Sequence, residues 1–155
     1  MSNFVITGTS SGIGKSIACE LSKNNNVIGI SKSNSNINEK NFKNLIFNFE
    51  NEVSQEIIKS ISDSFKDRKF TLIINAGVNF PDLDDSVVNF KKSVEILKVN
   101  YLNQILFFTK IHQEMNLPIE KLLFISSYDV FYNRCYASFG YVLSKSLLFE
   151  TSKIF

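Results

Sequence analysis

The chain has 155 residues, the size of one domain, and is long enough to bury a hydrophobic core. Its 17 basic and 15 acidic residues leave a formal net charge of +2, too small an excess to indicate a nucleic-acid or membrane-surface partner. Because no apolar run approaches ~18 residues and no signal pattern opens the chain, we expect a cytoplasmic protein.

Metal and disulfide chemistry find little support in the composition. The two cysteines, Cys19 and Cys135, form neither a disulfide framework nor a metal-ligand spacing. His112 is the single histidine, so a zinc site is not expected. We therefore predict no bound metal.

The hydrophobic pattern alternates between strands and helices along the chain. Short β-branched or aromatic apolar runs predict strands at 3–7, 27–31, 44–49, 70–77 and 121–127. Helical periodicity predicts helices at 13–23 and 52–65, one long or two consecutive helices over 86–116, and a helix from about Gly140 that is still running at Phe155. This alternation predicts a single α/β domain over 1–155, with about five strands in a doubly wound parallel sheet and helices on both faces.

The stretch TGTSSGIGKS, residues 7–16, has two interpretations as a phosphate-binding turn. A P-loop requires a glycine five positions before the glycine of GKS, but that position is Thr9, and Gly8 comes one residue too early. A P-loop enzyme also needs an aspartate at the end of another strand to hold magnesium, and the predicted strands end in asparagine and serine. The spacing therefore disfavours a P-loop.

The second interpretation is the first strand-to-helix turn of a dinucleotide-binding fold. Gly8 then permits the tight turn, Gly12 lets the backbone approach a pyrophosphate, and Gly14 lets the helix pack close to the strand. The phosphates would face unpaired N–H groups at a helix N-terminus.

Five motifs in order resemble those of the short-chain dehydrogenase/reductase family. The glycine turn is similar to the family's T-G-x-x-x-G-[IL]-G signature. The other four are NAG at 75–77, VNYL at 99–102, ISS at 125–127 and YVLSK at 141–145. The resemblance implies a Rossmann-like sheet with strand order 3-2-1-4-5.

The resemblance also implies an NAD(P)-dependent oxidoreductase that transfers a hydride between nicotinamide and a carbonyl or alcohol substrate. In that role Tyr141 is the general acid/base, Lys145 holds the nicotinamide ribose and favours the phenolate, Ser127 binds the substrate oxygen and Asn100 positions a water. The implied cofactor site comprises Gly8, Thr9, Ser10, Ser11, Gly12, Ile13, Gly14, Lys32, Asn48, Asn75, Ala76, Gly77, Tyr141 and Lys145.

The residues after the second and third predicted strands bear on cofactor preference. NAD enzymes of this fold usually place an acidic residue after the second strand, whereas this chain has ISKS, with Lys32 where a cation could meet a 2′-phosphate. We therefore favour NADP and keep NAD as the alternative. Asn48 takes the place of the family's usual adenine-contacting aspartate.

Two departures from the family pattern leave alternatives open. Ser127 lies one residue farther from Tyr141 than is usual, so Ser126 remains a second candidate for the catalytic serine. The family's later strands and substrate loop have no counterpart in this sequence. Three functions are therefore compatible with the sequence: an oxidoreductase, a dinucleotide-binding protein without useful catalysis, and a non-catalytic interaction module. Substrate and reaction direction stay open, and the resemblance suggests a homo-oligomer that pairs through the helices near 98–115 and 141–155.

Overall fold

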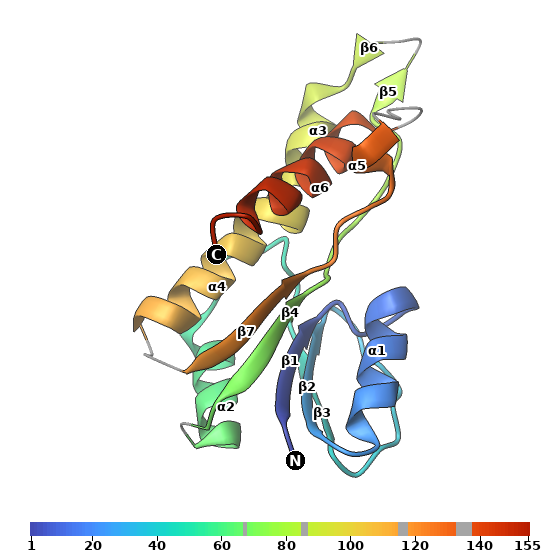
Figure 1. Ribbon diagram of the computed structural model, residues 1–155. Coiled ribbons are helices and arrows are strands. Elements are labelled where there is room, and N and C mark those ends of the chain that lie inside the picture. Colours follow the sequence, from blue (N-terminus) through green and yellow to red (C-terminus); the bar gives the residue numbers. More distant parts are fainter. Residues whose placement is uncertain (67, 85–86, 115–117, 133–137) are drawn as a thin grey trace.

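Five parallel strands form the central sheet in the computed structural model of this chain, which describes residues 1–66, 68–84, 87–114, 118–132 and 138–155 (Figure 1). They are β1 (Asn3–Thr7), β2 (Asn26–Ser31), β3 (Phe42–Ile46), β4 (Phe70–Ile74) and β7 (Ile119–Phe124). Their order in space is β3-β2-β1-β4-β7, which confirms the predicted order 3-2-1-4-5.

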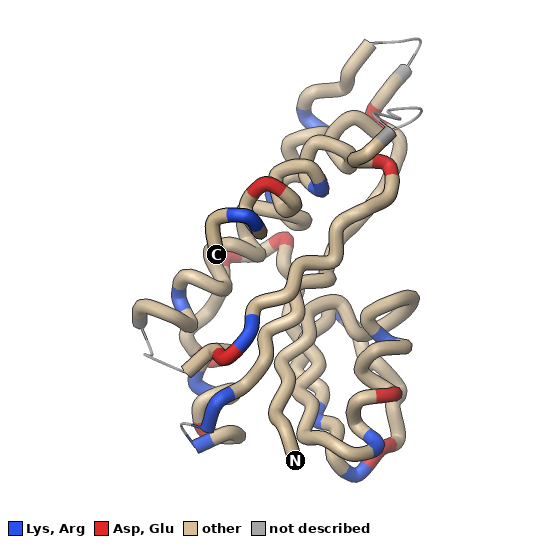
Figure 2. Tube along the Cα trace, in the orientation of Figure 1, with Lys and Arg blue, Asp and Glu red and all other residues tan. Residues whose placement is uncertain are grey.

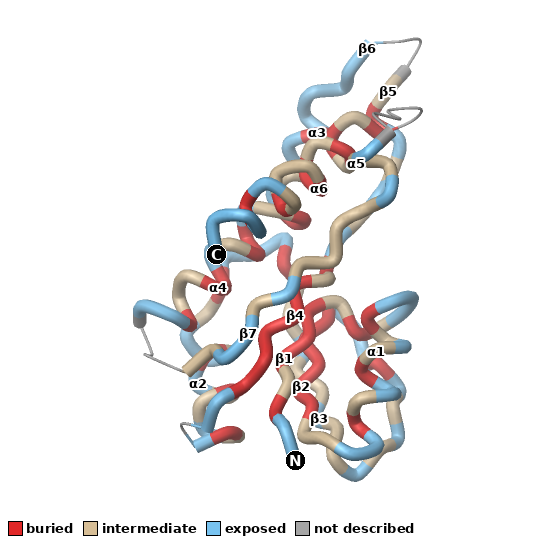
Figure 3. The backbone as a smooth tube through the Cα atoms, viewed as in Figure 1, coloured by how far each residue is buried: buried red, intermediate tan, exposed pale blue. Residues whose placement is uncertain are grey.

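The middle of the sheet explains why its strands read as continuous apolar runs. β1 pairs with β2 on one side and β4 on the other, and all five residues of β4 are buried. Figure 3 shows this buried centre in red, with β7 more exposed at the edge. A strand covered by helices on both faces has no solvent side, so polar alternation is lost.

Helices cover both faces, as predicted. The helices are α1 (Gly12–Ser22), α2 (Gln55–Phe65), α3 (Phe90–Leu97), α4 (Asn103–Glu114), α5 (Asp129–Tyr132) and α6 (Phe139–Thr151). Ala18 of α1 packs with Ile6 and Ile73 on one face. A larger cluster on the other face joins strand residues to α2, α4 and α6, including Ile61, Phe107 and Leu148. In Figure 1, α1 lies alone beside the sheet while α2, α4 and α6 lie across from it.

The predicted boundaries of several elements were wrong; the fourth strand ends at Ile74 rather than residue 77, and the fifth spans Ile119–Phe124 rather than 121–127. The third strand ends at Ile46 rather than residue 49, because its partner β2 ends at Ser31, which pairs with Ile46. Phe49 instead turns into the core and makes an edge contact with Phe107, with ring centroids 5.6 Å apart. The last helix stops at Thr151 and does not run to Phe155, because the N–H groups of Lys153 and Ile154 donate to carbonyls three residues back rather than four.

The region predicted as one or two helices over 86–116 contains α3 and α4 joined by a single π-helical turn, η1 (Lys98–Leu102). Residues 86 and 115–116 of that prediction lie outside the described chain. A short hairpin of β5 (Leu83–Asp84) and β6 (Val87–Val88) precedes α3 and was not predicted. A π turn inserts one extra residue into a helix and is frequent at functional sites, which directs attention to Asn100 within it.

Two glycines of the first turn provide a matched test of this packing. Gly8 and Gly12 both have positive φ, 77° and 58°, so an alanine at either pays the cost of the left-handed region. A Cβ at Gly8 would also lie 2.6 Å from the Ala76 Cα, whereas a Cβ at Gly12 would meet nothing within 4 Å. We predict that Gly8→Ala lowers the free energy of unfolding by about 1–3 kcal/mol more than Gly12→Ala. Urea denaturation followed by circular dichroism measures both; equal losses would contradict the close approach.

Candidate functional site

A cavity of about 580 Å³ opens where the five strands end. Its lining follows β1, β2, β3, β4 and β7 in turn, and helix α6 supplies the remaining wall. Predicted site residues that line it are Gly8, Ser10, Ser11, Gly12, Ile13, Lys32, Asn48, Asn75, Ala76, Gly77, Tyr141 and Lys145. Four other predicted site residues lie in or beside the elements that form the wall but do not line the cavity: Thr9, Gly14, Asn100 and Ser127.

The two central strand ends are tied together by side chains. The buried Thr7 hydroxyl accepts from the backbone N–H groups of Asn75 (3.0 Å) and Ala76 (2.9 Å). The Asn75 amide in turn donates to the carbonyls of Thr7 (3.0 Å) and Gly8 (3.2 Å). Asn75 therefore supports the glycine turn as well as lining the cavity.

Gly14 and Thr9 act behind the cavity surface. A Cβ at Gly14 would collide with the Gly8 carbonyl oxygen and the Asn75 amide, so helix α1 can approach the turn only with glycine there. The buried Thr9 hydroxyl lies 2.8 Å from that of Ser35 and 3.4 Å from that of Ser31. These contacts fix the glycine turn against the segment that follows β2.

Lys32 and Asn48 lie at the ends of the next two strands. Lys32 is exposed and lines the cavity, and the Asn48 side-chain oxygen accepts from the Glu50 N–H (3.1 Å). Figure 2 shows basic and acidic positions interspersed along the trace. Among the described residues that line the cavity after β2 and β3, Lys32 is the one basic residue. An exposed cation at this edge suits a phosphate group.

Asn100 is fully buried in the π turn and joins three elements. Its amide oxygen accepts from the Val78 N–H (2.7 Å), while its amide nitrogen donates to the Val78 carbonyl (2.9 Å) and to the Ser144 hydroxyl (3.1 Å). The loop after β4 is thereby fixed to helix α6. Asn100 is thus hydrogen-bonded to α6, the helix that carries both Tyr141 and Lys145.

Tyr141 and Lys145 lie one turn apart on α6 and both line the cavity. Lys145 is only 4% exposed, its Nζ donates to the Ile125 carbonyl (2.9 Å), and Nζ is 5.9 Å from the centroid of the Tyr141 ring. Burial lowers the pKa of the Lys145 ammonium from 10.5 to about 8, because its charged form is poorly solvated. A cation is thus held beside the phenol at neutral pH.

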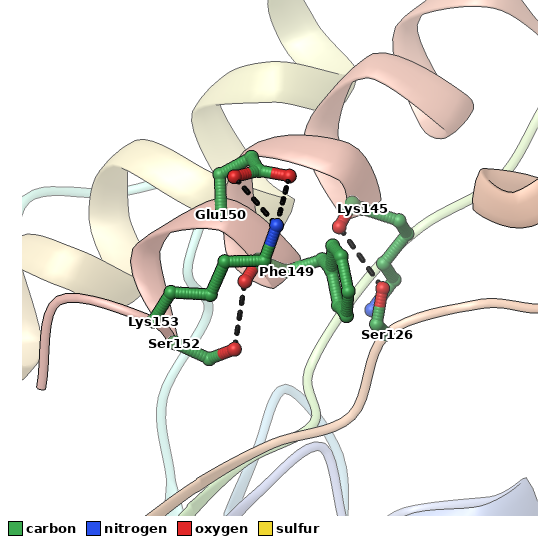
Figure 4. Close-up of polar contacts among 6 residues, drawn as sticks. All are labelled: Ser126, Lys145, Phe149, Glu150, Ser152 and Lys153. Atoms are coloured by element: carbon green, nitrogen blue, oxygen red, sulfur yellow. Dashed lines mark hydrogen bonds and ion pairs between the residues drawn. The ribbon is translucent and has the colours of Figure 1, made fainter.

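The two candidate serines have different partners. The Ser126 hydroxyl donates to the Lys145 backbone carbonyl (3.0 Å), and Ser126 lines the cavity (Figure 4). The half-buried Ser127 hydroxyl donates to the Asp129 carboxylate (3.1 Å) at the start of α5. Ser126 therefore joins the segment after β7 to α6, whereas the hydroxyl of Ser127 contacts Asp129, the first residue of α5.

Several lining residues were missed by sequence reasoning. They are Phe47, Phe49, Glu50, Val78, Asn79, Val99 and Ile125. Most directly follow or neighbour a strand end, so strand boundaries were the signal that could have found them. The predicted third strand hid Phe47 and Phe49, because it extended past Ile46.

The sequence matches no protein-family model and no curated protein. Solved structures nevertheless match across the chain. A short chain dehydrogenase family protein from Francisella tularensis subsp. tularensis SCHU S4 is 26% identical, with a TM-score of 0.79 over 99% of this chain and 62% of its own. The chain has the fold of this short-chain dehydrogenase, which agrees with the resemblance that its sequence motifs carry.

Two further solved structures share the fold of this chain. Thermoplasma acidophilum aldohexose dehydrogenase is 21% identical, with a TM-score of 0.77 over 99% of this chain and 59% of its own. A 4-hydroxyisoleucine dehydrogenase complexed with NADH is 19% identical, with a TM-score of 0.79 over 99% and 67%. The chain therefore spans 59–67% of the length of these three structures.

Two further features concern the described residues: clusters of possible metal ligands and helices that could cross a membrane. In that part of the chain no group of three or more histidine, cysteine, aspartate or glutamate side chains could hold a metal ion. None of the helices described is both long and apolar enough to cross a membrane. Cys135 falls outside the described residues.

Because Lys145 is buried, we expect the unfolding free energy of the chain to depend on pH. Its pKa is lower in the folded chain, about 8, than its ordinary 10.5, so the unfolded chain binds more protons between these values and stability rises with pH there. We predict that, relative to Lys145→Met, the unfolding free energy of the wild type rises by roughly 3 kcal/mol from pH 8 to pH 10.5 and is flat below pH 8.

Urea denaturation over this pH range makes the measurement. Lys43→Met is the matched control, because Lys43 is exposed and its Nζ bonds to Ser64. The difference in unfolding free energy between the wild type and Lys43→Met should stay constant over this pH range. Parallel wild-type and Lys145→Met curves would show that Lys145 is not desolvated.

Proposed function

We propose that this chain is an NAD(P)-dependent oxidoreductase that interconverts a carbonyl and an alcohol. The observation that carries the proposal is the meeting of two separate sets of residues in one cavity: the glycine turn after β1 and the Tyr141–Lys145 pair of α6. The first suits a pyrophosphate and the second suits proton transfer to an oxygen. A bound nicotinamide dinucleotide would supply the hydride.

The cavity offers a place for each part of such a cofactor. Gly8, Gly12 and the N-terminus of α1 would hold the pyrophosphate, because that helix end presents free N–H groups and the positive end of its dipole. Phe47 and Asn48 would border the adenine. Exposed Lys32 would meet a 2′-phosphate, so we propose NADP as the preferred cofactor; NAD is the alternative.

Proton transfer would be carried out by Tyr141. Lys145 Nζ lies 5.9 Å from the centroid of the Tyr141 ring, and the Tyr141 hydroxyl could give a proton to the substrate oxygen or take one from it. Lys145 would also hold the nicotinamide ribose once released from the Ile125 carbonyl. Ser127 would donate to the substrate oxygen after leaving Asp129, and Asn100 would connect Lys145 to a water.

A dinucleotide-binding protein without turnover is the second candidate, because the glycine turn and the N-terminus of α1 alone suit a pyrophosphate. The glycine turn lines the cavity next to the start of α1, and binding there does not require Tyr141 or Lys145. Pairing of two copies through the long helices also stays a proposal. The proposed pairing is supported by two exposed apolar side chains, Leu102 of η1 (55% exposed) and Leu106 of α4 (38% exposed).

The turnover proposal is tested with Tyr141→Phe. Loss of the hydroxyl removes the proton donor, so we predict that oxidation of NADPH over a panel of carbonyl compounds falls by about 10²-fold or more while NADPH affinity stays within about twofold. Tyr101→Phe is the control, since the Tyr101 hydroxyl bonds to Thr151 (3.0 Å) and Tyr101 does not line the cavity. Dinucleotide binding by the wild type with no turnover on any substrate would favour the second candidate.

The same assay separates the two serines. Ser127→Ala should lower kcat/KM by about tenfold or more. Ser126→Ala should instead lower the unfolding free energy by about 1 kcal/mol, because it removes the bond to Lys145, with a smaller change in kcat/KM. The reverse pattern would assign the catalytic hydroxyl to Ser126.

A further inference from the structure

The carboxylate of Asp82 is buried at the meeting point of three segments and takes no part in the chemistry described above. Asp82 is 1% exposed, and it precedes the β5 strand. One carboxylate oxygen accepts from the Phe139 N–H (2.6 Å), and the other accepts from the Gly140 N–H (2.7 Å) and the Ser93 hydroxyl (2.6 Å). A buried carboxylate with three short hydrogen bonds is fully used as an acceptor.

These bonds hold the N-terminus of α6. Phe139 and Gly140 are the first two residues of the helix, and their N–H groups have no acceptor within it. The negative charge of Asp82 also lies at the positive end of the helix dipole. The next amide, that of Tyr141, donates to the Ser138 hydroxyl (3.3 Å), so side chains accept from the first three N–H groups of the helix.

Asp82 also fixes this turn against α3. Ser93, which donates to Asp82, belongs to α3, and a Cβ at Gly140 would lie 2.7 Å from the Ser93 Cα and 2.8 Å from an Asp82 oxygen. The two helices are therefore in backbone contact at this point. Figure 1 shows α3 and α6 side by side in this region.

The far side of the same helix segment has a separate attachment. Lys145 Nζ donates to the Ile125 carbonyl, and the Ser126 hydroxyl donates to the Lys145 carbonyl. Tyr141 lies between the two attachments, one residue after Gly140 and four before Lys145. Loss of the Asp82 contacts would release the Tyr141 end of the helix while Lys145 stays held.

We propose that Asp82 is a positioning residue, which sets the place of the Tyr141 hydroxyl in the cavity by anchoring the first turn of α6 to α3. The effect on turnover rests on the proposed function; the anchoring itself does not. The loss should therefore appear in the rate of proton transfer more than in dinucleotide binding.

The test is Asp82→Asn, which keeps the size of the side chain but replaces one acceptor oxygen with an NH₂ donor. Hydrogen exchange of individual amides, followed by NMR, should show Phe139 and Gly140 exchanging at least about tenfold faster, because a bond to a charged acceptor is lost. Amides of β1 should keep their wild-type rates. Turnover with NADPH should fall by about tenfold or more, with NADPH affinity within about twofold of wild type.

Asp63→Asn is the matched control, since Asp63 is an exposed aspartate on α2. Unchanged exchange at Phe139 and Gly140, or equally faster exchange throughout β1, would overturn the anchoring role. Local fraying with unchanged turnover would overturn the positioning of Tyr141. Ser93→Ala removes one of the three bonds and should give the same pattern at smaller size, which keeps the test available if Asp82→Asn does not fold. A wild type without turnover would refute the proposed function, and exchange would still decide whether Asp82 anchors α6.

Discussion

The bond network between the ends of β1 and β4 is the constraint on which the rest of the site depends. Thr7 and Asn75 exchange side-chain and backbone hydrogen bonds across these neighbouring strands, and all of these groups lie at the carboxyl edge of the sheet. The contact is so close that Gly8 and Gly14 have no room for a Cβ. Helix α1 starts directly after this contact between the ends of β1 and β4. The direction of its N-terminal amides is therefore set by the two strands and not by the loop alone.

A second group of contacts places Tyr141 and Lys145, the residues of the proposed proton transfer, opposite that turn. Asn100 fixes α6 from the side, Ser126 from the segment after β7, and Asp82 from the helix end. Between them, Lys145 is held in a site that disfavours its charge. The fold thus tolerates a local loss of stability at a residue that the proposed chemistry uses, a cost that the surrounding packing offsets.

Much of this arrangement was predictable from sequence because it depends on local patterns. The apolar runs of β1 and β4 are buried on both faces, so composition alone marks them as strands, and glycine spacing marks the turn between β1 and α1. Tyr141 and Lys145 are one helical turn apart, so a helix assignment was enough to place them on one face. These features need little knowledge of distant residues.

The features that were not predicted depend on distant partners. Phe47 and Phe49 are as strand-like as Leu45, and only the end of β2 at Ser31 shows where β3 stops. Asp82 is one of three aspartates within residues 82–85, and nothing local distinguishes it from a solvated residue. Its role appears only when Phe139 and Gly140, more than fifty positions later, are brought to it by the fold. The different partners of Ser126 and Ser127 likewise follow from where α6 lies.

The central claim is that the cavity at the strand ends binds a nicotinamide dinucleotide, and a fluorescence titration tests it most directly. Protein is added to NADPH and, separately, to NADH, and nicotinamide emission is followed; the chain has no tryptophan, so the protein background is low. The account predicts saturable binding of both, tighter for NADPH, with the NADPH advantage lost in Lys32→Ala and kept in Lys43→Ala, which changes a lysine outside the cavity lining. A folded sample that binds neither dinucleotide would contradict it.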